Sequence, residues 1–291
     1  MLKPKRAFIE VIMNRLLIVD GHNLLFQMFF GMPTRIIGRQ GKAVHGVIGF
    51  IGAINKLAEA YNPTHLIVMF DGEKQNPRKN ILKEYKANRI DYSTVSEEEN
   101  PFVQLPYIYE ALDYMGIKHT ETTDCETDDV IASYAIKYGV ENEVMISSFD
   151  SDYFQLINEN VRVIRYKGKS SQIFDSNYIL EKYGIDPDMY LDWKCLVGDT
   201  SDNIPGIRGV GPKTAAKLIN TFGGIDSIIN HCAEIESEKI RLAISEGVEA
   251  IARNLSLIRL SDVAALPFTL EEAQFTNPNI RTMDVIRGIG H

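Results

Sequence analysis

Short apolar segments that alternate with helical segments constrain this fold more than any other feature of the sequence. The apolar segments are 16–19, 66–70, 144–147 and 161–166. Apolar runs of this length are typical of strands that are buried on both faces of a parallel sheet. Helices are predicted between them over 47–61, 102–115 and 127–138. This order predicts an α/β fold in which helices flank a mostly parallel central sheet.

The pattern becomes helical from about Ser176 onward. We therefore expect an α/β catalytic core over 1–185 and a smaller α-helical module over 186–291. Residues 1–12 are either an N-terminal extension or precede a true start at Met13. Charged and polar residues interrupt the apolar stretch there, which excludes a signal peptide and a membrane span.

Charge and cysteine content narrow the function classes. The 31 Lys and Arg residues are outnumbered by 39 Asp and Glu residues, giving a formal charge of −8. This balance excludes a basic nucleic-acid coat protein but not a nuclease, because each bound Mg²⁺ offsets two carboxylates. The three cysteines form no Cys-x-x-Cys motif, which favours packing roles in a reduced, cytoplasmic setting.

Acidic residues follow three of the predicted strands. Asp20 and Asp71 come directly after two of them, and Asp150 and Asp152 follow the third. Because the carboxyl ends of parallel strands lie along one edge of the sheet, these side chains should converge although they are distant in sequence.

Two further acidic groups extend this set. Glu126, Asp128 and Asp129 lie at the start of the helix over 127–138, and Asp199 and Asp202 lie in a GDTSDN loop. Any one of them could be a helix cap or a turn residue. As a set, they would repel one another unless hard cations were present, and oxygen-only ligands suit Mg²⁺ or Mn²⁺. Two such ions can activate water and stabilise a leaving oxygen in phosphodiester hydrolysis.

The segment GIRGVGPKTAA at 206–216 matches a helix-hairpin-helix pattern. Its glycines let backbone N–H groups approach a phosphate, and a helix N-terminus favours the anion. Contacts of this kind do not distinguish bases, so binding should be independent of DNA sequence and sensitive to salt. The candidate DNA-binding residues here are Gly206, Arg208, Gly209, Gly211, Lys213, Thr214 and Lys217.

A basic stretch precedes the acidic run SEEEN. It is predicted to be helical over 78–89, and its cations are Arg78, Lys79, Lys83, Lys86 and Arg89. Two interpretations remain open: a cationic arm that draws a phosphate toward the metals, or a solvated helix face.

These motifs together resemble the 5′-nuclease family, which includes the exonuclease domain of bacterial DNA polymerase I, phage 5′-exonucleases and flap endonucleases. The matching segments are LLIVDG at 16–21, VMFDG at 68–72, EYKANR at 84–89, CETDDVIA at 125–132, ISSFDSD at 146–152 and GDTSDNIPGIRGVGPKTAAKLI at 198–219. The resemblance implies a PIN-like fold with a helical arch around 77–106. It also implies a monomeric, structure-specific nuclease that hydrolyses DNA at 5′ ends and 5′ flaps, leaving a 5′ phosphate and a 3′ hydroxyl.

The resemblance also implies roles for individual residues. Asp20, Asp71, Glu126, Asp128 and Asp129 match a first metal cluster, and Asp150, Asp152, Asp199 and Asp202 match a second. Lys86 and Arg89 match arch residues that contact the reacting phosphate, and Tyr85 is implied to stack on a base or sugar. Arg78 and Lys83 are further candidate DNA contacts. A K⁺ ion is implied at the helix-hairpin-helix.

Three positions depart from the family pattern. Gln27 stands where Arg is usual, Phe149 where Gly is usual, and Ser151 where a basic residue is usual. These departures affect the expected rate and substrate preference more than the chemistry. Two alternatives stay open: a PIN-like ribonuclease, and a catalytically weak protein that binds DNA structures.

Overall fold

The computed structural model describes residues 13–39, 41–72, 77–87, 90–123, 125–262 and 265–291. Its central sheet has six strands in the order β3-β2-β1-β4-β5-β6. All neighbouring strands are parallel except β5 and β6. The strands are β1 (Arg15–Asp20), β2 (His65–Asp71), β3 (Lys118–Thr122), β4 (Glu143–Ser147), β5 (Val161–Arg165) and β6 (Gln172–Phe174). The predicted mostly parallel sheet is therefore confirmed.

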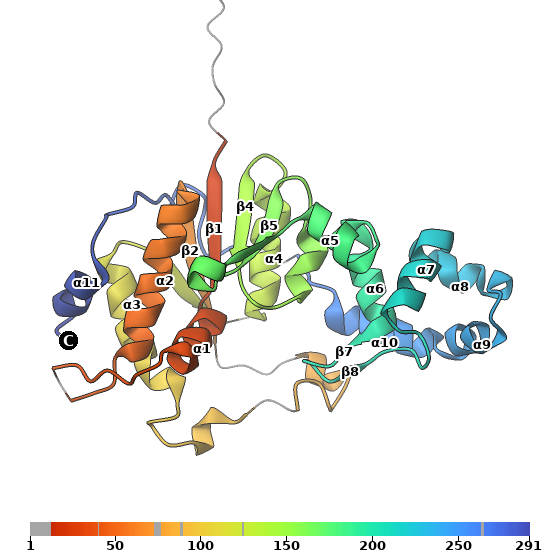
Figure 1. Cartoon of the computed structure of the whole chain (residues 1–291), viewed down its shortest axis with the longest axis horizontal. Coiled ribbons are helices and arrows are strands. Elements are labelled where there is room, and N and C mark those ends of the chain that lie inside the picture. The colour runs from red at the N-terminus through yellow and green to blue at the C-terminus, as the bar shows by residue number, and fades with distance from the viewer. Residues whose placement is uncertain (1–12, 40, 73–76, 88–89, 124, 263–264) are drawn as a thin grey trace, which may run out of the picture.

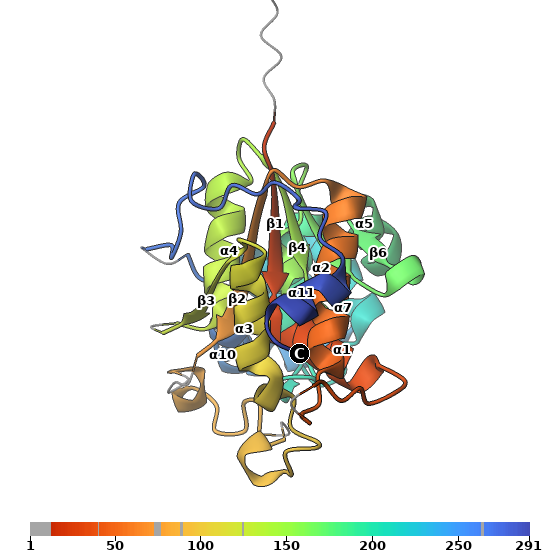
Figure 2. The same ribbon diagram turned by 90° about the vertical axis from the view of Figure 1, so that its left-hand side faces the viewer.

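Hydrophobic layers cover both faces of this sheet. Leu16 and Ile18 of β1 belong to one buried cluster, and Leu17 and Val19 belong to the other. Alternate side chains of a strand point to opposite faces, which explains why the inner strands are apolar throughout. Figure 2 shows α2 and α3 on one face of the sheet and α4 on the other. The helices of the core are α1 (Gly21–Gly31), α2 (His45–Tyr61), α3 (Leu105–Tyr114), α4 (Thr127–Tyr138) and α5 (Ser176–Tyr183).

A helical region lies beside the β5 side of the sheet (Figure 1). It contains α6 (Tyr190–Val197), α7 (Pro212–Phe222), α8 (Ile225–Asn230), α9 (Glu238–Glu246) and α10 (Val248–Ile258), together with a small ribbon of β7 (Gly198–Asp199) and β8 (Ile204–Pro205). After it, the chain returns to the core. The backbone N–H of Phe275 donates to the carbonyl of Thr64 at 2.8 Å. The last helix, α11 (Thr282–Gly288), packs against α2 and α3.

The segment between β2 and α3 lies below the carboxyl ends of the strands in both views (Figures 1 and 2). Its described residues form three short 3₁₀ helices, η1 (Pro77–Asn80), η2 (Tyr92–Thr94) and η3 (Pro101–Gln104). The prediction of a continuous helix over 78–89 is wrong, because Lys86 has a φ of 54°, in the left-handed region that interrupts a right-handed helix. Residues 88 and 89 lie outside the described residues.

The sequence-based prediction lacks the strands β3 and β6 and the helix α1. The edge strand β3 has the polar sequence KHTET, which carries no apolar run because only β2 pairs with it. Helix α1 begins directly after β1 and is capped by Asp20, whose Oδ1 accepts the N–H of Asn23 at 3.1 Å. In the described residues, no helix is long and apolar enough to cross a membrane.

Candidate active site

The first cluster of acids forms where β1, β2 and α4 meet. Asp20 is buried at the end of β1, and its Oδ2 accepts the hydroxyl of Ser148 at 2.8 Å. Burial, together with the charges of Asp128 and Asp71, raises the pKa of Asp20 well above its usual range. The side chain of Asp71 is 53% exposed. Desolvation beside the other acids raises its pKa, but hydrogen bonds to His22 and Thr127 outweigh this and lower the pKa of Asp71 to about 2.

The start of α4 contributes the other three acids of this cluster. Tyr153 donates its hydroxyl to Asp128 Oδ1 at 2.7 Å, and burial and the charge of Asp150 raise the pKa of Asp128 to about 6. Glu126 and Asp129 instead pair with Arg78 of η1, whose side chain is only 9% exposed. Arg78 was expected at the DNA surface, but here it lies among the acids, and its role as a DNA contact stays a prediction.

The second cluster contains a buried cation, Lys194, that no sequence motif predicted. Lys194 of α6 is buried and pairs with Asp152 and with Asp199, the latter at 2.5 Å. Burial raises the pKa of Asp152 to about 7 although Lys194 opposes it, whereas the bonds of Asp199 to Lys194 and Ser201 outweigh burial and lower its pKa. A lysine within the otherwise apolar run at the end of α6 was the only sequence signal for it.

Lys86 joins the two clusters. Its Nζ lies 3.7 Å from Glu126 Oε1, 4.0 Å from Asp128 Oδ2 and 3.9 Å from Asp202 Oδ2. The backbone N–H of Lys86 also donates to the carbonyl of Asp202 at 3.1 Å. A left-handed backbone at a non-glycine residue costs free energy, and such conformations concentrate at functional sites.

The other predicted contacts of the arch fall in different environments. Lys83 is exposed. Tyr85 is only 2% exposed and packs in the core, with Lys86 Nζ 4.9 Å from its ring centre. A Tyr85 ring that stacks on DNA would have to leave this position, so that role stays a prediction. Arg89, the second candidate catalytic residue, lies outside the described residues.

The three departures from the family pattern have defined neighbours. Gln27 donates its side-chain N–H to the carbonyl of Tyr166, which ties α1 to the end of β5. The backbone N–H of Phe149 donates to Asn23 Oδ1 at 3.0 Å. The hydroxyl of Ser151 accepts from Lys194 at 3.2 Å. Each of the three residues therefore forms a hydrogen bond within the protein, either near the carboxyl edge of the sheet or in the second cluster.

The chemistry of these side chains suits hard divalent cations, because nearly every donor is a carboxylate oxygen. Burial first, and then the charges of neighbouring acids, raise the pKa values of Asp20, Asp128 and Asp152. Within the described part of the chain, however, no group of three Asp, Glu, His or Cys residues is arranged to hold a metal ion. Arg78, Lys86 and Lys194 lie among the acids instead, so ion binding requires these cations or the carboxylates to move.

The carboxylates predict a pH dependence of the metal-free protein. The folded-state pKa values of Asp128 and Asp152, about 6 and about 7, lie above the ordinary value of 3.8. Between pH 4 and 7 the folded state therefore holds protons that the unfolded state has lost, and these groups make stability fall as pH rises through that window. We expect the melting temperature in saturating Mg²⁺ to exceed that in EDTA by a margin that grows from pH 5 to pH 8. An EDTA–Mg²⁺ difference that does not grow with pH would contradict this charge balance.

The hairpin between α6 and α7 lies next to the second cluster. A side chain at Gly206 would collide with the carbonyl of Val197, and Gly209 has a φ of +85°. The glycines are therefore required by close approach and by backbone conformation. Arg208, Lys213 and Lys217 are exposed at this end, and Thr214 is half-buried on the first turn of α7, whose N-cap is Gly211.

The side chain of Asn254 in α10 connects this helix to the hairpin through hydrogen bonds. Its buried side-chain amide donates to the carbonyls of Cys195 at 3.0 Å and Pro205 at 2.8 Å. Replacing Asn254 by Ala leaves both carbonyls without this donor, and we expect a loss of about 2–3 kcal/mol in the free energy of unfolding. Urea unfolding would measure it, with Ser256→Ala on the exposed face of α10 as the control. A loss equal to that of the control would contradict this role.

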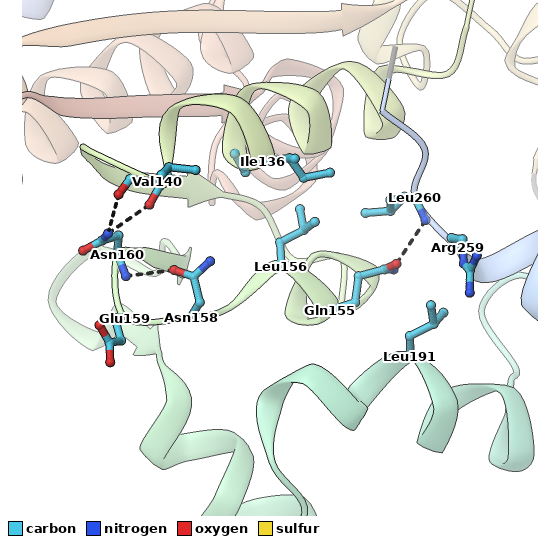
Figure 3. Close-up of a pocket in the computed structure, with 12 residues that line it drawn as sticks. Ile136, Val140, Gln155, Leu156, Asn158, Glu159, Asn160, Leu191, Arg259 and Leu260 are labelled. Atoms are coloured by element: carbon cyan, nitrogen blue, oxygen red, sulfur yellow. Dashed lines mark hydrogen bonds between the residues drawn. The ribbon is translucent and has the colours of Figure 1, made fainter. Parts of the chain in front are cut away.

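A separate pocket of about 630 Å³ opens between α4, the 3₁₀ helix η4 (Asp152–Leu156) and the end of α10 (Figure 3). Gln155 lines this pocket, and its side-chain carbonyl accepts the backbone N–H of Leu260 at 3.0 Å. Its wall combines apolar side chains such as Ile136 and Leu191 with Asn158, Glu159 and Arg259. The lining contains none of the nine acids, so the pocket is distinct from the clusters.

The sheet with acids along its carboxyl edge and the attached helix-hairpin-helix together have the architecture of the 5′-nucleases. Family models match almost the whole described chain: "5′-3′ exonuclease, N-terminal resolvase-like domain" over residues 15–184 and "5′-3′ exonuclease, C-terminal SAM fold" over 185–281. The chain belongs to the 5′–3′ exonuclease family.

Individual relatives agree with this assignment. A 5′–3′ exonuclease of Aquifex aeolicus is 31% identical over 93% of this chain and 90% of its own length. DNA polymerase I of Thermus thermophilus is 32% identical over 91% of this chain, and the match covers only 31% of the length of that polymerase. Among solved structures, the zinc-bound 5′-exonuclease of bacteriophage T5 has a TM-score of 0.70, 25% identity and coverage of 95% of this chain and 100% of its own. The catalytic core of Rad2 shares the fold alone, at 16% identity and a TM-score of 0.56.

Proposed function

We propose that this chain is a Mg²⁺-dependent nuclease that hydrolyses DNA phosphodiesters at 5′ ends and 5′ flaps. The observation that carries the proposal is the position of Lys86, whose ammonium lies within 4.0 Å of Glu126 and Asp128 at the start of α4 and of Asp202 in the loop after β7. Family membership supports the same reaction class, and a flap endonuclease of bacteriophage T5 with the same fold has been solved in complex with DNA and metal ions.

The proposed metal ligands are the nine acids of the two clusters. Asp20, Asp71 and Asp128, with Glu126 and Asp129, would hold one ion, and Asp150, Asp152, Asp199 and Asp202 the other. When bound, Mg²⁺ or Mn²⁺ would supply an activated water and charge compensation at the leaving oxygen. The products would then carry a 5′ phosphate and a 3′ hydroxyl.

The chain's own cations would position the reacting phosphate. Lys86 holds a positive charge between the two clusters, where the extra negative charge of the transition state would develop. Arg89 is proposed to act beside it. No protein side chain is required as a covalent nucleophile.

The hairpin would bind the duplex part of the substrate. Arg208, Lys213 and Lys217 are exposed around the N-terminal end of α7, where backbone N–H groups and the helix dipole favour a phosphate. We propose that a K⁺ ion bound by backbone carbonyls stabilises this turn. Contacts of this type make DNA affinity independent of sequence and strongly dependent on salt.

Substrate geometry tests the proposal directly. Purified protein would be incubated in Mg²⁺ with labelled 5′-flap DNA, 3′-flap DNA, blunt duplex, and a 5′-flap substrate whose flap is RNA. We expect cutting near the 5′-flap junction, none at the 3′ flap, and none in EDTA. Preferential cutting of RNA would favour the ribonuclease alternative. Binding of the 5′-flap substrate in Mg²⁺ without any cutting would favour the alternative of a protein that binds DNA structures without cleaving them.

A further inference from the structure

Lys194 sits inside the second cluster in an unusual position for a lysine. Its side chain is only 4% exposed and comes from α6, whereas Asp152 is the first residue of η4. The ammonium donates to Asp152 Oδ1, lies 2.5 Å from Asp199 Oδ2 and donates to Ser151 Oγ at 3.2 Å. It therefore connects η4 to β7 through two carboxylates.

Contacts with Lys194 and Ser201 involve three of the four carboxylate oxygens of Asp152 and Asp199. Asp199 Oδ2 faces Lys194, while its Oδ1 accepts the backbone N–H of Ser201 at 2.7 Å and the hydroxyl of the same residue. Asp152 likewise gives Oδ1 to Lys194. A divalent ion approaching this pair meets a positive charge at close range, and charges of the same sign repel strongly in a buried site.

The core of the first cluster differs. The donors to Asp20 are neutral, the backbone N–H of Asn23 and the hydroxyl of Ser148. Asp128 accepts from the neutral hydroxyl of Tyr153, and the ammonium of Lys86 is 4.0 Å from its other oxygen. Arg78 pairs with Glu126 and Asp129 of the same cluster. A divalent ion held by Asp20 and Asp128 would meet less opposing positive charge at contact distance than one held by Asp152 and Asp199 beside Lys194.

We propose that Lys194 is a positioning residue that acts as a built-in counter-ion of the second cluster. It holds Asp152 and Asp199 together before an ion arrives, and it competes with that ion. The second cluster consequently takes up its divalent ion more weakly than the first. The inference rests on the proposed function, because it assigns the two clusters to divalent ions.

Metal titration without DNA tests this inference independently of cleavage. The full chain, stripped with EDTA, would be titrated with Mn²⁺ by calorimetry, and wild type should show one tight and one weak binding event. In Lys194→Met the weak event should tighten by about tenfold or more, since one opposing buried charge is gone. Lys194→Gln, which keeps a hydrogen-bond donor but no charge, should change in the same direction. Lys182→Met on the exposed face of α5 is the matched control and should titrate as wild type.

A double-mutant cycle assigns the effect to the second cluster. Adding Asp150→Asn to Lys194→Met should remove the gained affinity, whereas adding Asp71→Asn should leave it. Thermal unfolding gives a second readout. The metal-free Lys194→Met protein should melt below wild type, because buried carboxylates lose their counter-ion, yet gain more melting temperature from Mn²⁺ than wild type does.

The outcomes separate this inference from the proposed function. A folded Lys194→Met or Lys194→Gln protein whose weak event is unchanged or weakened would overturn the competition, while wild-type binding of Mn²⁺ would leave the metal-dependent nuclease intact. Two equally tight events in wild type would also overturn it. If wild type binds no Mn²⁺ at all, both the inference and the metal-dependent function are overturned.

Discussion

Replacing Asp128 by Asn is expected to abolish metal-dependent cleavage while stabilising the metal-free protein. Burial, together with the charges of Asp150 and Asp71, raises the pKa of this carboxylate to about 6. At pH 8 the folded protein must keep it ionised against that repulsion. A shift of about two units corresponds to roughly 2–3 kcal/mol, which the neutral amide removes. Asn can still accept the hydroxyl of Tyr153, so the local packing is kept.

Cleavage should fall because the same charge is needed once an ion is present. Loss of a single preorganised electrostatic group in an active site typically costs about 10²–10³ in rate, and loss of an ion ligand should reach at least the upper end of that range. The measurement pairs single-turnover cleavage of a 5′-flap substrate with urea unfolding in EDTA at pH 8. Asp188→Asn, an exposed acid near α6, is the control for both assays. Retained cleavage would show that Asp128 is not part of the active site. A metal-free variant less stable than wild type would show that the protein already compensates the charge of Asp128.

Much of the fold could be predicted because the inner strands are buried on both faces. The predicted strands over 16–19, 66–70, 144–147 and 161–166 coincide with β1, β2, β4 and β5 to within one residue or so at each end. The polar edge strand β3 could not be predicted, since half-exposed edges require no apolar run. The basic stretch over 78–89 has helical spacing of its lysines, but spacing alone does not reveal that Lys86 adopts a left-handed backbone to reach the acids.

The acids of the site were predictable from topology, whereas their cations were not. Asp20 and Asp71 follow strands that are neighbours in a parallel sheet, so strand order alone places them together. The contact of Lys194 with Asp152 joins a helix of the second half of the chain to the sheet edge, and only tertiary packing brings them within reach. The same holds for Arg78, whose charge suggested DNA and whose guanidinium instead faces Glu126 and Asp129.

Replacing Lys86 by Met should lower the rate of the chemical step by about 10²–10³ while changing DNA affinity little. Lys86 lies between the clusters, where its charge would stabilise the transition state more than the bound substrate. DNA affinity should change little because a single phosphate contact contributes little to the binding of a whole duplex. Replacing Lys213 by Met at the exposed hairpin should do the opposite. It should weaken binding, reduce the slope of log K against log salt by about one, and leave the rate on saturating DNA unchanged.

The two variants therefore separate chemistry from binding within one chain. Single-turnover rates and dissociation constants for the same 5′-flap substrate would be measured for both, with Lys56→Met on the exposed surface of α2 as the control. If Lys86→Met weakened binding and kept its rate, the basic stretch would be a DNA-docking surface rather than part of the active site. If Lys86→Met lowered only the rate, the left-handed backbone at Lys86 would be explained by its role in the active site. No other described position on the arch brings an ammonium within 4.0 Å of Glu126, Asp128 and Asp202 together.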